Sequence, residues 1–345
     1  MIRAAIINIT GYAGIDLGRL LHLHPEVEIT QVTGRSAVGQ KLGEAFPHLA
    51  AIDLVIQDEV EGSVDVAFSA LPQTASAEAI IPLVEKGVKV IDISADFRLK
   101  DPSEYEEWYG VPHPKPSLLE DSVYGLTELY RDEISQSGLV ANPGCYPTAA
   151  ILALAPAIKA GLIGGDIIVD AKSGVSGAGR GLSLTTHFSE VNENVSAYSV
   201  TGHRHLPEIT QELRRVVNGF EPRVTFLPHL IPMTRGILNS CYASIKDGVV
   251  PEGSAGVKEI RDLYKDYYNG EPFVKVVDGS PMTKHTLGNN NCIIYPTVDI
   301  RTNRLIVISC LDNLVKGAAG QAIQNMNLML GFPETEGLEQ IAIYP

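Results

Sequence analysis

The residue best placed for covalent chemistry in this sequence is Cys145, which follows Pro143-Gly144 and begins a long helical pattern. Pro-Gly predicts a turn, so the thiol is expected at the N-terminus of a helix. Unpaired backbone N–H groups and the helix dipole lower the pKa of a thiol there, which increases the fraction of nucleophilic thiolate. Polar Asn142 and Thr148 flank it, whereas Cys310 lies in an apolar run typical of inert core cysteines. A structural role for Cys145 is the alternative, since most cysteines at helix starts are structural.

A second chemical feature is the segment 173–180, Ser-Gly-Val-Ser-Gly-Ala-Gly-Arg. So many glycines and serines exclude the interior of a stable helix or strand and predict a loop rich in N–H and hydroxyl donors. Lys172 and Arg180 bracket this loop, so a phosphate group would find both hydrogen-bond donors and positive charge. We predict Ser173, Ser176, Gly177 and Arg180 as substrate-binding residues; the alternative is a flexible surface loop.

Two histidines flank an arginine in His203-Arg204-His205, and Glu208 follows within one helical turn. Histidine is the natural proton donor near neutral pH, and a carboxylate partner fixes its tautomer. His203 and His205 are therefore candidates for acid–base catalysis, and Arg204 and Glu208 for substrate binding. A metal site is disfavoured, because no third ligand is close and Arg204 lies between the imidazoles. Pro207 also suits the first position of a helix, and the two interpretations are compatible.

The stretch Gly11-Tyr12-Ala13-Gly14 follows an apolar strand-like run and opens a helical pattern. Small residues there let backbone N–H groups approach a pyrophosphate, whose charge the helix N-terminus favours. Asn8 stands where the usual fingerprint has its first glycine, but asparagine tolerates left-handed backbone better than most residues. We predict a dinucleotide-binding turn at Gly11, Tyr12, Ala13 and Gly14; the alternative is a plain strand–helix turn.

The end of the next strand-like run, Thr33-Gly34-Arg35-Ser36, indicates which dinucleotide is bound. NAD enzymes favour an acidic residue at this strand end, where it bonds the ribose hydroxyls. Arg35 and Ser36 instead suit a 2′-phosphate, so the sequence predicts NADPH. The alternative is that Arg35 is a solvated loop arginine.

The elements that must position these residues fall into two halves. In the first, strands predicted at 4–9, 28–33, 64–69 and 88–93 alternate with helices at 14–24 and 75–86, and the proline-rich segment 110–116 is loop. This alternation predicts an α/β, doubly wound parallel sheet. In the second, strands predicted at 167–169, 223–227, 237–245 and 292–300 show polar alternation, and residues 313–330 are helical. We expect a mostly antiparallel sheet there, in an α+β domain.

Composition limits the partners and the compartment. A chain of 345 residues predicts two domains, and a net charge of −14 argues against nucleic-acid or membrane partners. An anionic small molecule would need converging cations, for which Lys172, Arg180, Arg204 and Arg235 are available. The four cysteines form no C-x-x-C pair, which disfavours zinc and disulfides. The N-terminus lacks signal-peptide features and the apolar run 149–158 is too short to span a bilayer, so a cytoplasmic protein is expected.

With these motifs in chain order, the sequence resembles the N-acetyl-γ-glutamyl-phosphate reductase family. That family shares its architecture with aspartate-semialdehyde and glyceraldehyde-phosphate dehydrogenases. Asn8, in place of the family's first glycine, and Ile9 are the main departures. The matching stretches span nearly the whole chain: residues 11–14, 94–99, 124–129, 143–148, 173–180, 203–209, 232–236 and 312–317.

The resemblance implies an enzyme that reduces N-acetyl-L-glutamyl 5-phosphate to the 5-semialdehyde and phosphate in arginine biosynthesis. Cys145 would form a thioester, NADPH would supply hydride, and residues 203–205 would supply the acid–base group, with His203 favoured over His205. It also implies three regions: a Rossmann-type NADP-binding domain (1–144), a catalytic and oligomerisation domain (145–312), and a C-terminal helix (313–345) that returns to the first domain. Asn313 would lie near the nicotinamide, and the chain would form a homotetramer or dimer.

Three other functions fit parts of the pattern. A reductase of 2-aminoadipyl phosphate in lysine biosynthesis would show nearly the same motifs. A non-catalytic nucleotide-binding regulator would lack the cysteine or the histidines, which this chain keeps. A cysteine hydrolase using Cys145 and His203 would not need the turn at 11–14 or Arg35.

Overall fold

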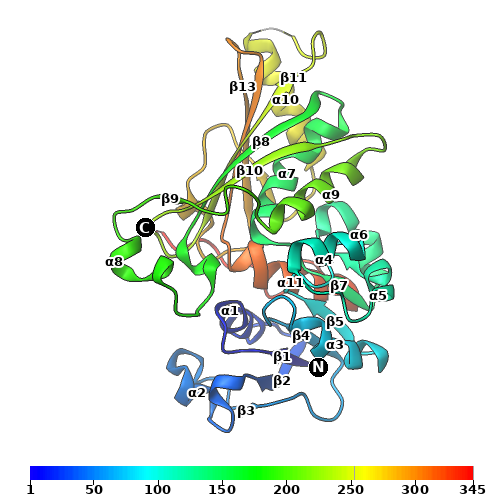
Figure 1. The fold of residues 1–345 in the computed structure, drawn as a ribbon, viewed down its shortest axis with the longest axis vertical. Coiled ribbons are helices and arrows are strands. Elements are labelled where there is room, and N and C mark those ends of the chain that lie inside the picture. Colours follow the sequence, from blue (N-terminus) through cyan, green and yellow to red (C-terminus); the bar gives the residue numbers. More distant parts are fainter. Residues whose placement is uncertain (252, 345) are drawn as a thin grey trace. The chain divides into compact units, whose positions relative to one another are not determined.

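The computed structural model describes residues 1–251 and 253–344. It divides into two compact units, of which the first contains Met1–Gly144 and Ala318–Gln340. The second contains Cys145–Gly317 and the described residues from Ile341 onward. Figure 1 shows the elements of both units. Within the described ranges, none of the helices combines the length and apolarity that crossing a membrane requires.

The first unit is built on a seven-stranded sheet with the order β3-β2-β1-β4-β5-β7-β6, in which every neighbouring pair is parallel. The central strand β4 is buried along its whole length, as expected for a strand covered on both faces. The predicted parallel α/β sheet is therefore confirmed. The strands are β1 (Ile2–Ile7), β2 (Val27–Thr33), β3 (Ile56–Gln57), β4 (Val66–Ser69), β5 (Lys89–Asp92), β6 (Val123–Tyr124) and β7 (Leu139–Ala141).

The helices of the first unit include one from the end of the chain, α11, whose buried amides bind the unit. Gln321 and Asn325 both donate hydrogen bonds to the Gly125 carbonyl, and Gln324 donates to Thr127. The helices are α1 (Tyr12–Leu21), η1 (Arg35–Ala37), α2 (Leu42–Ala45), η2 (Pro47–Leu49), α3 (Ser76–Glu85), α4 (Pro102–Tyr109), α5 (Ser117–Asp121), α6 (Thr127–Gln136) and α11 (Gly320–Leu330).

The second unit also has a seven-stranded sheet, with the order β12-β13-β14-β11-β8-β10-β9. The β12–β13 and β8–β10 pairs are parallel and the other neighbours are antiparallel, which confirms the mostly antiparallel sheet. The strands are β8 (Ile163–Ser173), β9 (Ser196–Ala197), β10 (Arg223–Leu230), β11 (Ile237–Ile245), β12 (Val274–Val276), β13 (Cys292–Asp299) and β14 (Arg304–Leu311).

The helices of the second unit differ from the prediction at one point: residues 315–319 form a π-helical turn, and the regular α-helix starts only at Gly320. The helical elements of this unit are α7 (Cys145–Lys159), η3 (Val175–Ala178), η4 (Leu184–Thr186), α8 (Phe188–Val191), α9 (His205–Val216), α10 (Ser254–Tyr267), η5 (Thr283–Thr286) and η6 (Val315–Ala319).

Helix α7 is the core element of the second unit and is fastened to its sheet by side-chain donors. Asn239 donates to the carbonyl of Tyr146 at 3.2 Å, and Ser309 donates to that of Ala149 at 2.9 Å. The carbonyl of Leu152 has no N–H partner one turn on because that residue is Pro156, and the hydroxyl of Tyr268 takes its place at 2.5 Å. The helix that begins at Cys145 is therefore held rigidly.

Candidate active site

Cys145 is the first residue of α7, as the Pro-Gly turn predicts, and it is partly exposed. The other three cysteines are buried. The backbone of Gly317, in the π-helical turn η6, packs directly against Cys145: a Cβ added at Gly317 would lie 2.6 Å from the Cβ of Cys145. The thiol therefore sits at a helix N-terminus beside a backbone that only glycine permits.

The residue after the nucleophile candidate brings both histidines into the same cluster. The ring of Tyr146 lies 6.0 Å from that of His203 and 5.9 Å from that of His205, and the two imidazoles are 4.8 Å apart. The Tyr198 hydroxyl donates to the Tyr146 hydroxyl at 3.2 Å, and its ring lies 5.5 Å from His203. Burial raises the pKa of Tyr198 to about 12, and the charge of Cys145 also raises it, which places the thiol within electrostatic reach of the cluster.

His203 has a defined protonation state in this cluster. Burial, followed by the positive charge of Arg204, lowers its pKa to about 4, so the ring is neutral at pH 7. The backbone N–H of His205 donates to Nδ1 of His203 at 3.0 Å, so the proton of the neutral ring is on Nε2. His203 is therefore a neutral hydrogen-bond donor. Residue types and spacing alone gave no sign of this.

The neighbouring candidates lie at the start of α9. Arg204 is exposed and immediately precedes the helix, whereas Glu208 is buried in its first turn. Because α9 begins at His205, Pro207 occupies the third helical position and not the first. The first turn still tolerates proline, since its N–H groups have no partner within the helix.

The segment 173–180 is an ordered loop closed by the short helix η3. Ser173 is the buried last residue of β8, and its hydroxyl donates to the Gly174 carbonyl at 2.9 Å. The N–H of Ser176 donates to the carbonyl of Thr234 at 3.1 Å. Gly177 and Arg180 are exposed. The predicted loop is present, and its Ser176 end is fixed by neighbouring backbone.

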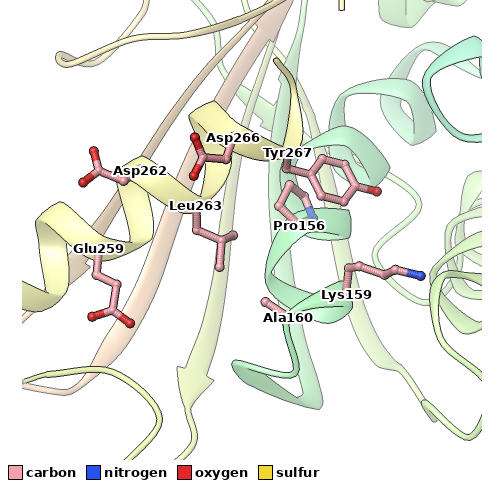
Figure 2. A pocket seen from close by; sticks show the side chains of 8 residues that line it. All are labelled: Pro156, Lys159, Ala160, Glu259, Asp262, Leu263, Asp266 and Tyr267. Carbon is pink, nitrogen blue, oxygen red and sulfur yellow. The ribbon is translucent and has the colours of Figure 1, made fainter. Parts of the chain in front are cut away.

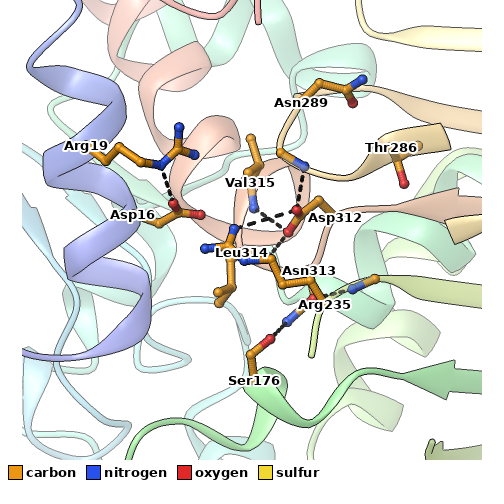
Figure 3. A network of polar contacts seen from close by, with 12 residues as sticks. Asp16, Arg19, Ser176, Arg235, Thr286, Asn289, Asp312, Asn313, Leu314 and Val315 are labelled. Atoms are coloured by element: carbon orange, nitrogen blue, oxygen red, sulfur yellow. Dashed lines mark hydrogen bonds and ion pairs between the residues drawn. The ribbon is translucent and has the colours of Figure 1, made fainter. Parts of the chain in front are cut away.

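Asn313 joins this loop to a second turn of the same unit (Figure 3). Its Nδ2 donates to the hydroxyl of Ser176 at 2.9 Å, and its Oδ1 accepts from the N–H of Gly236 at 2.7 Å. The preceding Asp312 accepts from the N–H of Gly288 at 2.8 Å and lies 3.6 Å from the guanidinium of Arg235. Thus both polar ends of the Asn313 side chain are engaged within the second unit.

Lys172, expected to add positive charge to the loop, is in an ion pair. Its ammonium lies 2.5 Å from the carboxylate of Asp170 on the same strand. The imidazole of His229 on β10 lies 3.3 Å from the other oxygen of that carboxylate. Asp170 and Lys172 are two residues apart on a strand and so share a face, a signal that the sequence does contain. The charge of Lys172 is largely offset.

The turn at 11–14 in the first unit has the close packing that a dinucleotide turn requires. A Cβ at Gly14 would lie 2.4 Å from the carbonyl oxygen of Asn8, and α1 starts at the exposed Tyr12. Asn8 has a left-handed backbone with φ of 65°, as the sequence predicts. The turn follows β1, which lies between β2 and β4 at the point where the strand order reverses, the usual place for a nucleotide in such sheets.

Arg35 and Ser36 begin η1 immediately after β2 and are both exposed. This is the strand end at which the ribose of a dinucleotide is recognised. The residues of the first unit therefore fit a dinucleotide with a 2′-phosphate.

A separate pocket of about 490 Å³ lies between the C-terminal end of α7 and α10 (Figure 2). Its described lining includes Lys159 and the carboxylates Glu259, Asp262 and Asp266. Asp262 forms an ion pair with Lys258. The residues proposed for chemistry do not line this pocket.

Two family models match the chain. Residues 3–137 match the semialdehyde dehydrogenase NAD binding domain, and residues 145–313 match the semialdehyde dehydrogenase dimerisation domain. N-acetyl-gamma-glutamyl-phosphate reductases are similar over the whole chain. That of Dehalococcoides mccartyi strain BAV1 is 57% identical, with 99% of each chain covered, and that of Heliobacterium modesticaldum is 49% identical, with 100% of each covered.

The chain belongs to the N-acetyl-γ-glutamyl-phosphate reductase family.

The fold of this reductase family member is also that of solved semialdehyde dehydrogenases. Aspartate semialdehyde dehydrogenase II from Vibrio cholerae has a TM-score of 0.73 at 17% identity, with 96% of this chain and 98% of that chain covered. The NADP complex of the Candida albicans aspartate semialdehyde dehydrogenase has a TM-score of 0.69 at 18% identity, with 96% and 98% covered. The predicted fold and family are therefore both confirmed.

Sequence reasoning missed two members of the reductase cluster, Tyr146 and Tyr198. Tyr146 was visible only as the residue after Cys145, and Tyr198 lies in a polar segment without a recognisable motif. Their hydroxyls meet across 52 residues of sequence, so only the tertiary fold reveals the pair.

Proposed function

We propose that this chain reduces N-acetyl-L-glutamyl 5-phosphate to N-acetyl-L-glutamate 5-semialdehyde and phosphate, with NADPH as the reductant. The observation that carries the proposal is the partly exposed Cys145 at the start of α7, one residue from the Tyr146 ring that contacts both histidines. Full-length identity of 49–57% to reductases of that name supports the substrate.

In the first step the Cys145 thiolate attacks the γ-carbonyl carbon, the carbon–phosphate oxygen bond breaks, and a thioester forms. The loop 173–180 would hold the departing phosphate. Because the Ser176 hydroxyl oxygen already accepts from Asn313, its own O–H is directed to another acceptor, and a phosphate oxygen fits that role. Asn313 would then act on the substrate through Ser176.

In the second step the thioester carbonyl must be reduced. Bound NADPH supplies hydride to this carbon. His203, neutral with its proton on Nε2, would donate a hydrogen bond to the oxygen as negative charge develops on it. His205 would provide the proton for that oxygen and accept it back as the tetrahedral adduct collapses to the aldehyde and the Cys145 thiolate. This division assigns different tasks to the two candidate histidines.

NADPH, and not NADH, is proposed on the basis of Arg35 and Ser36. Both are exposed at the end of β2, where a 2′-phosphate would lie, and residues 3–137 match an NAD binding domain model. A structural relative from Candida albicans carries NADP. Free cysteines are consistent with a reducing compartment, so we place the reaction in the cytoplasm.

A homo-oligomer, either a dimer or a homotetramer, is also proposed. The match of residues 145–313 to a dimerisation domain supports it. Together with residues 1–144 for cofactor binding, this assigns catalysis and association to the same part of the chain.

One assay tests the function. NADPH oxidation is followed with N-acetylglutamyl phosphate and with its one-carbon-longer 2-aminoadipyl analogue, and NADP⁺ reduction is followed with each semialdehyde in the presence of phosphate. We expect turnover with the glutamyl substrate to exceed that with the longer one. A preference for the longer substrate would favour the lysine-pathway reductase, and NADPH-independent hydrolysis would favour the hydrolase.

A further inference from the structure

The second unit contains one segment, residues 181–200, in which apolar side chains are exposed one after another. Here it is called the arm. The exposed fraction is 74% for Leu184 and 76% for Phe188. Leu182, Val195 and Val200 are exposed as well. Apolar side chains gathered on one exposed segment mark an interaction site more often than single exposed ones do.

The backbone of the arm contains strain that its own contacts do not explain. Glu193 and Ser199 have left-handed φ values of 59° and 48°, and both are exposed. Non-glycine residues stay in such conformations when the surrounding structure imposes them. Ser183, Thr186 and Asn194 make hydrogen bonds to other residues of the arm, so these bonds do not attach it to the sheet. A partner that covers the arm would supply the missing constraint.

Two observations identify the partner as a second copy of this chain. The arm lies inside residues 145–313, which match a dimerisation domain. Residues 181–189 contain no Asp, Glu, Lys or Arg, although the chain has a net charge of −14. An uncharged apolar surface lets two such chains associate without bringing like charges together.

The two ends of the arm connect to the proposed catalytic cluster. Before the arm, Ser176 is hydrogen-bonded to Asn313. Near its other end, Ala197 pairs with His229 of β10 and the Tyr198 hydroxyl reaches that of Tyr146. His203 follows three residues after Val200 and contacts the Tyr198 ring. Figure 1 shows the arm, marked by α8, extending from strands β8 and β10 of its own unit.

We propose that the arm packs against a second copy of this chain and that this contact orders Ser176, Tyr198 and His203, so that the site is complete only in the oligomer. This inference rests on the proposed function for its catalytic readout, but the association itself does not.

The test compares Phe188→Asp with Leu23→Asp. Leu23 is an exposed apolar residue of the first unit and lies outside the proposed site, so it controls for a surface charge. Mass is measured by sedimentation velocity, turnover by NADPH oxidation, and NADPH affinity by fluorescence titration. We expect the Phe188 variant to dissociate at concentrations at least about tenfold higher than wild type, because a buried apolar contact becomes a buried charge. Its kcat should fall in parallel, while its NADPH affinity, set by the first unit, should be retained and show that the chain is folded.

Dilution of the unaltered enzyme is a second measurement that needs no variant: its specific activity should fall as the oligomer dissociates. A Phe188 variant with wild-type mass overturns the proposed surface. A dissociated variant with full kcat overturns the link to the site. If the wild-type chain does not turn over the acyl phosphate at all, the proposed function fails, but the mass measurement still decides whether the arm is the interface.

Discussion

The side-chain amide of Asn8 donates a hydrogen bond to the carbonyl oxygen of Ala70 at 2.8 Å. Its backbone N–H donates to the hydroxyl of Thr33 at 3.2 Å. Ala70 follows β4 and Thr33 ends β2, so one residue ties the turn after β1 to both neighbouring strands. A glycine at this position would supply the left-handed backbone but not the side-chain bond to Ala70. The departure from the usual fingerprint therefore adds a contact to the turn.

Replacing Asn8 separates these two contributions. Asn8→Gly keeps the backbone conformation and loses the side-chain bonds, so we expect the dissociation constant for NADPH to rise about three- to tenfold, the value of one ordinary hydrogen bond. Asn8→Ala should in addition lower the melting temperature, because alanine disfavours positive φ. Asn303→Gly is the matched control, since Asn303 also has positive φ (50°) but lies in the second unit. Unchanged NADPH affinity in Asn8→Gly would show that the amide plays no part in binding.

Arg35 should discriminate between the two nicotinamide cofactors. Arg35→Ala removes the charge proposed to face the 2′-phosphate, so we expect NADPH affinity to fall about ten- to hundredfold, as for the loss of a charge-assisted hydrogen bond. NADH affinity should change little. Arg301→Ala is the control, because Arg301 is an exposed arginine of the second unit. Equal losses for both cofactors would refute recognition of the 2′-phosphate.

The sequence predicted elements well where local pattern and burial agree. The buried run of β4 and the Pro-Gly turn before α7 are such cases. It predicted only residues 167–169 of β8, which extends over Ile163–Ser173, because polar residues on its second face interrupt the apolar run. The π-helical turn η6 was predicted as ordinary helix. Its geometry coincides with the approach of Gly317 to Cys145, a tertiary contact that no local pattern encodes.

The same distinction applies to the candidate site. Turns and helix starts at Cys145, Ser176 and His203 could be predicted, because proline, glycine and polar residues determine them locally. The protonation state of His203 could not, since it depends on burial and on the backbone N–H of His205. The buried carboxylate of Asp96 was also unassigned; it accepts from three N–H groups around the start of α3 and so serves the fold of the first unit.

Cys145 should be the one cysteine that controls activity. Cys145→Ser should lower kcat by a factor of about a thousand or more, because an alkoxide is much harder to generate than a thiolate. Iodoacetamide should label one thiol per native chain, since the other three are buried, and inactivation should follow that labelling. NADPH affinity of the variant is the control for folding. Substantial turnover by Cys145→Ser would remove the covalent mechanism.

His203 should act as a hydrogen-bond donor and not as a proton carrier. His203→Gln keeps an N–H donor, so we expect it to retain more activity than His203→Ala, whose kcat should fall about a hundred- to a thousandfold, as for the loss of an oxyanion donor. His205→Gln should lose as much as His205→Ala, because an amide cannot transfer the proton. His48→Gln, an exposed histidine of the first unit, is the control. Equal losses in the two His203 variants would contradict the donor role.

The lowered pKa of His203 also makes stability depend on pH. The folded state has a pKa of about 4 and the ordinary value is 6.5, so between these values the unfolded chain binds the proton and the folded chain does not. The contribution of His203 to the free energy of unfolding is therefore fully present above pH 6.5 and is lost as the pH falls toward 4. Asp92 acts in the opposite direction, because burial raises its pKa to about 6, but it is common to wild type and variant. Urea unfolding of wild type and His203→Gln at pH 7.5 and pH 4.5 isolates the histidine. We expect acidification to destabilise the wild type more than the variant, and an identical loss in both would show that His203 is not the group responsible.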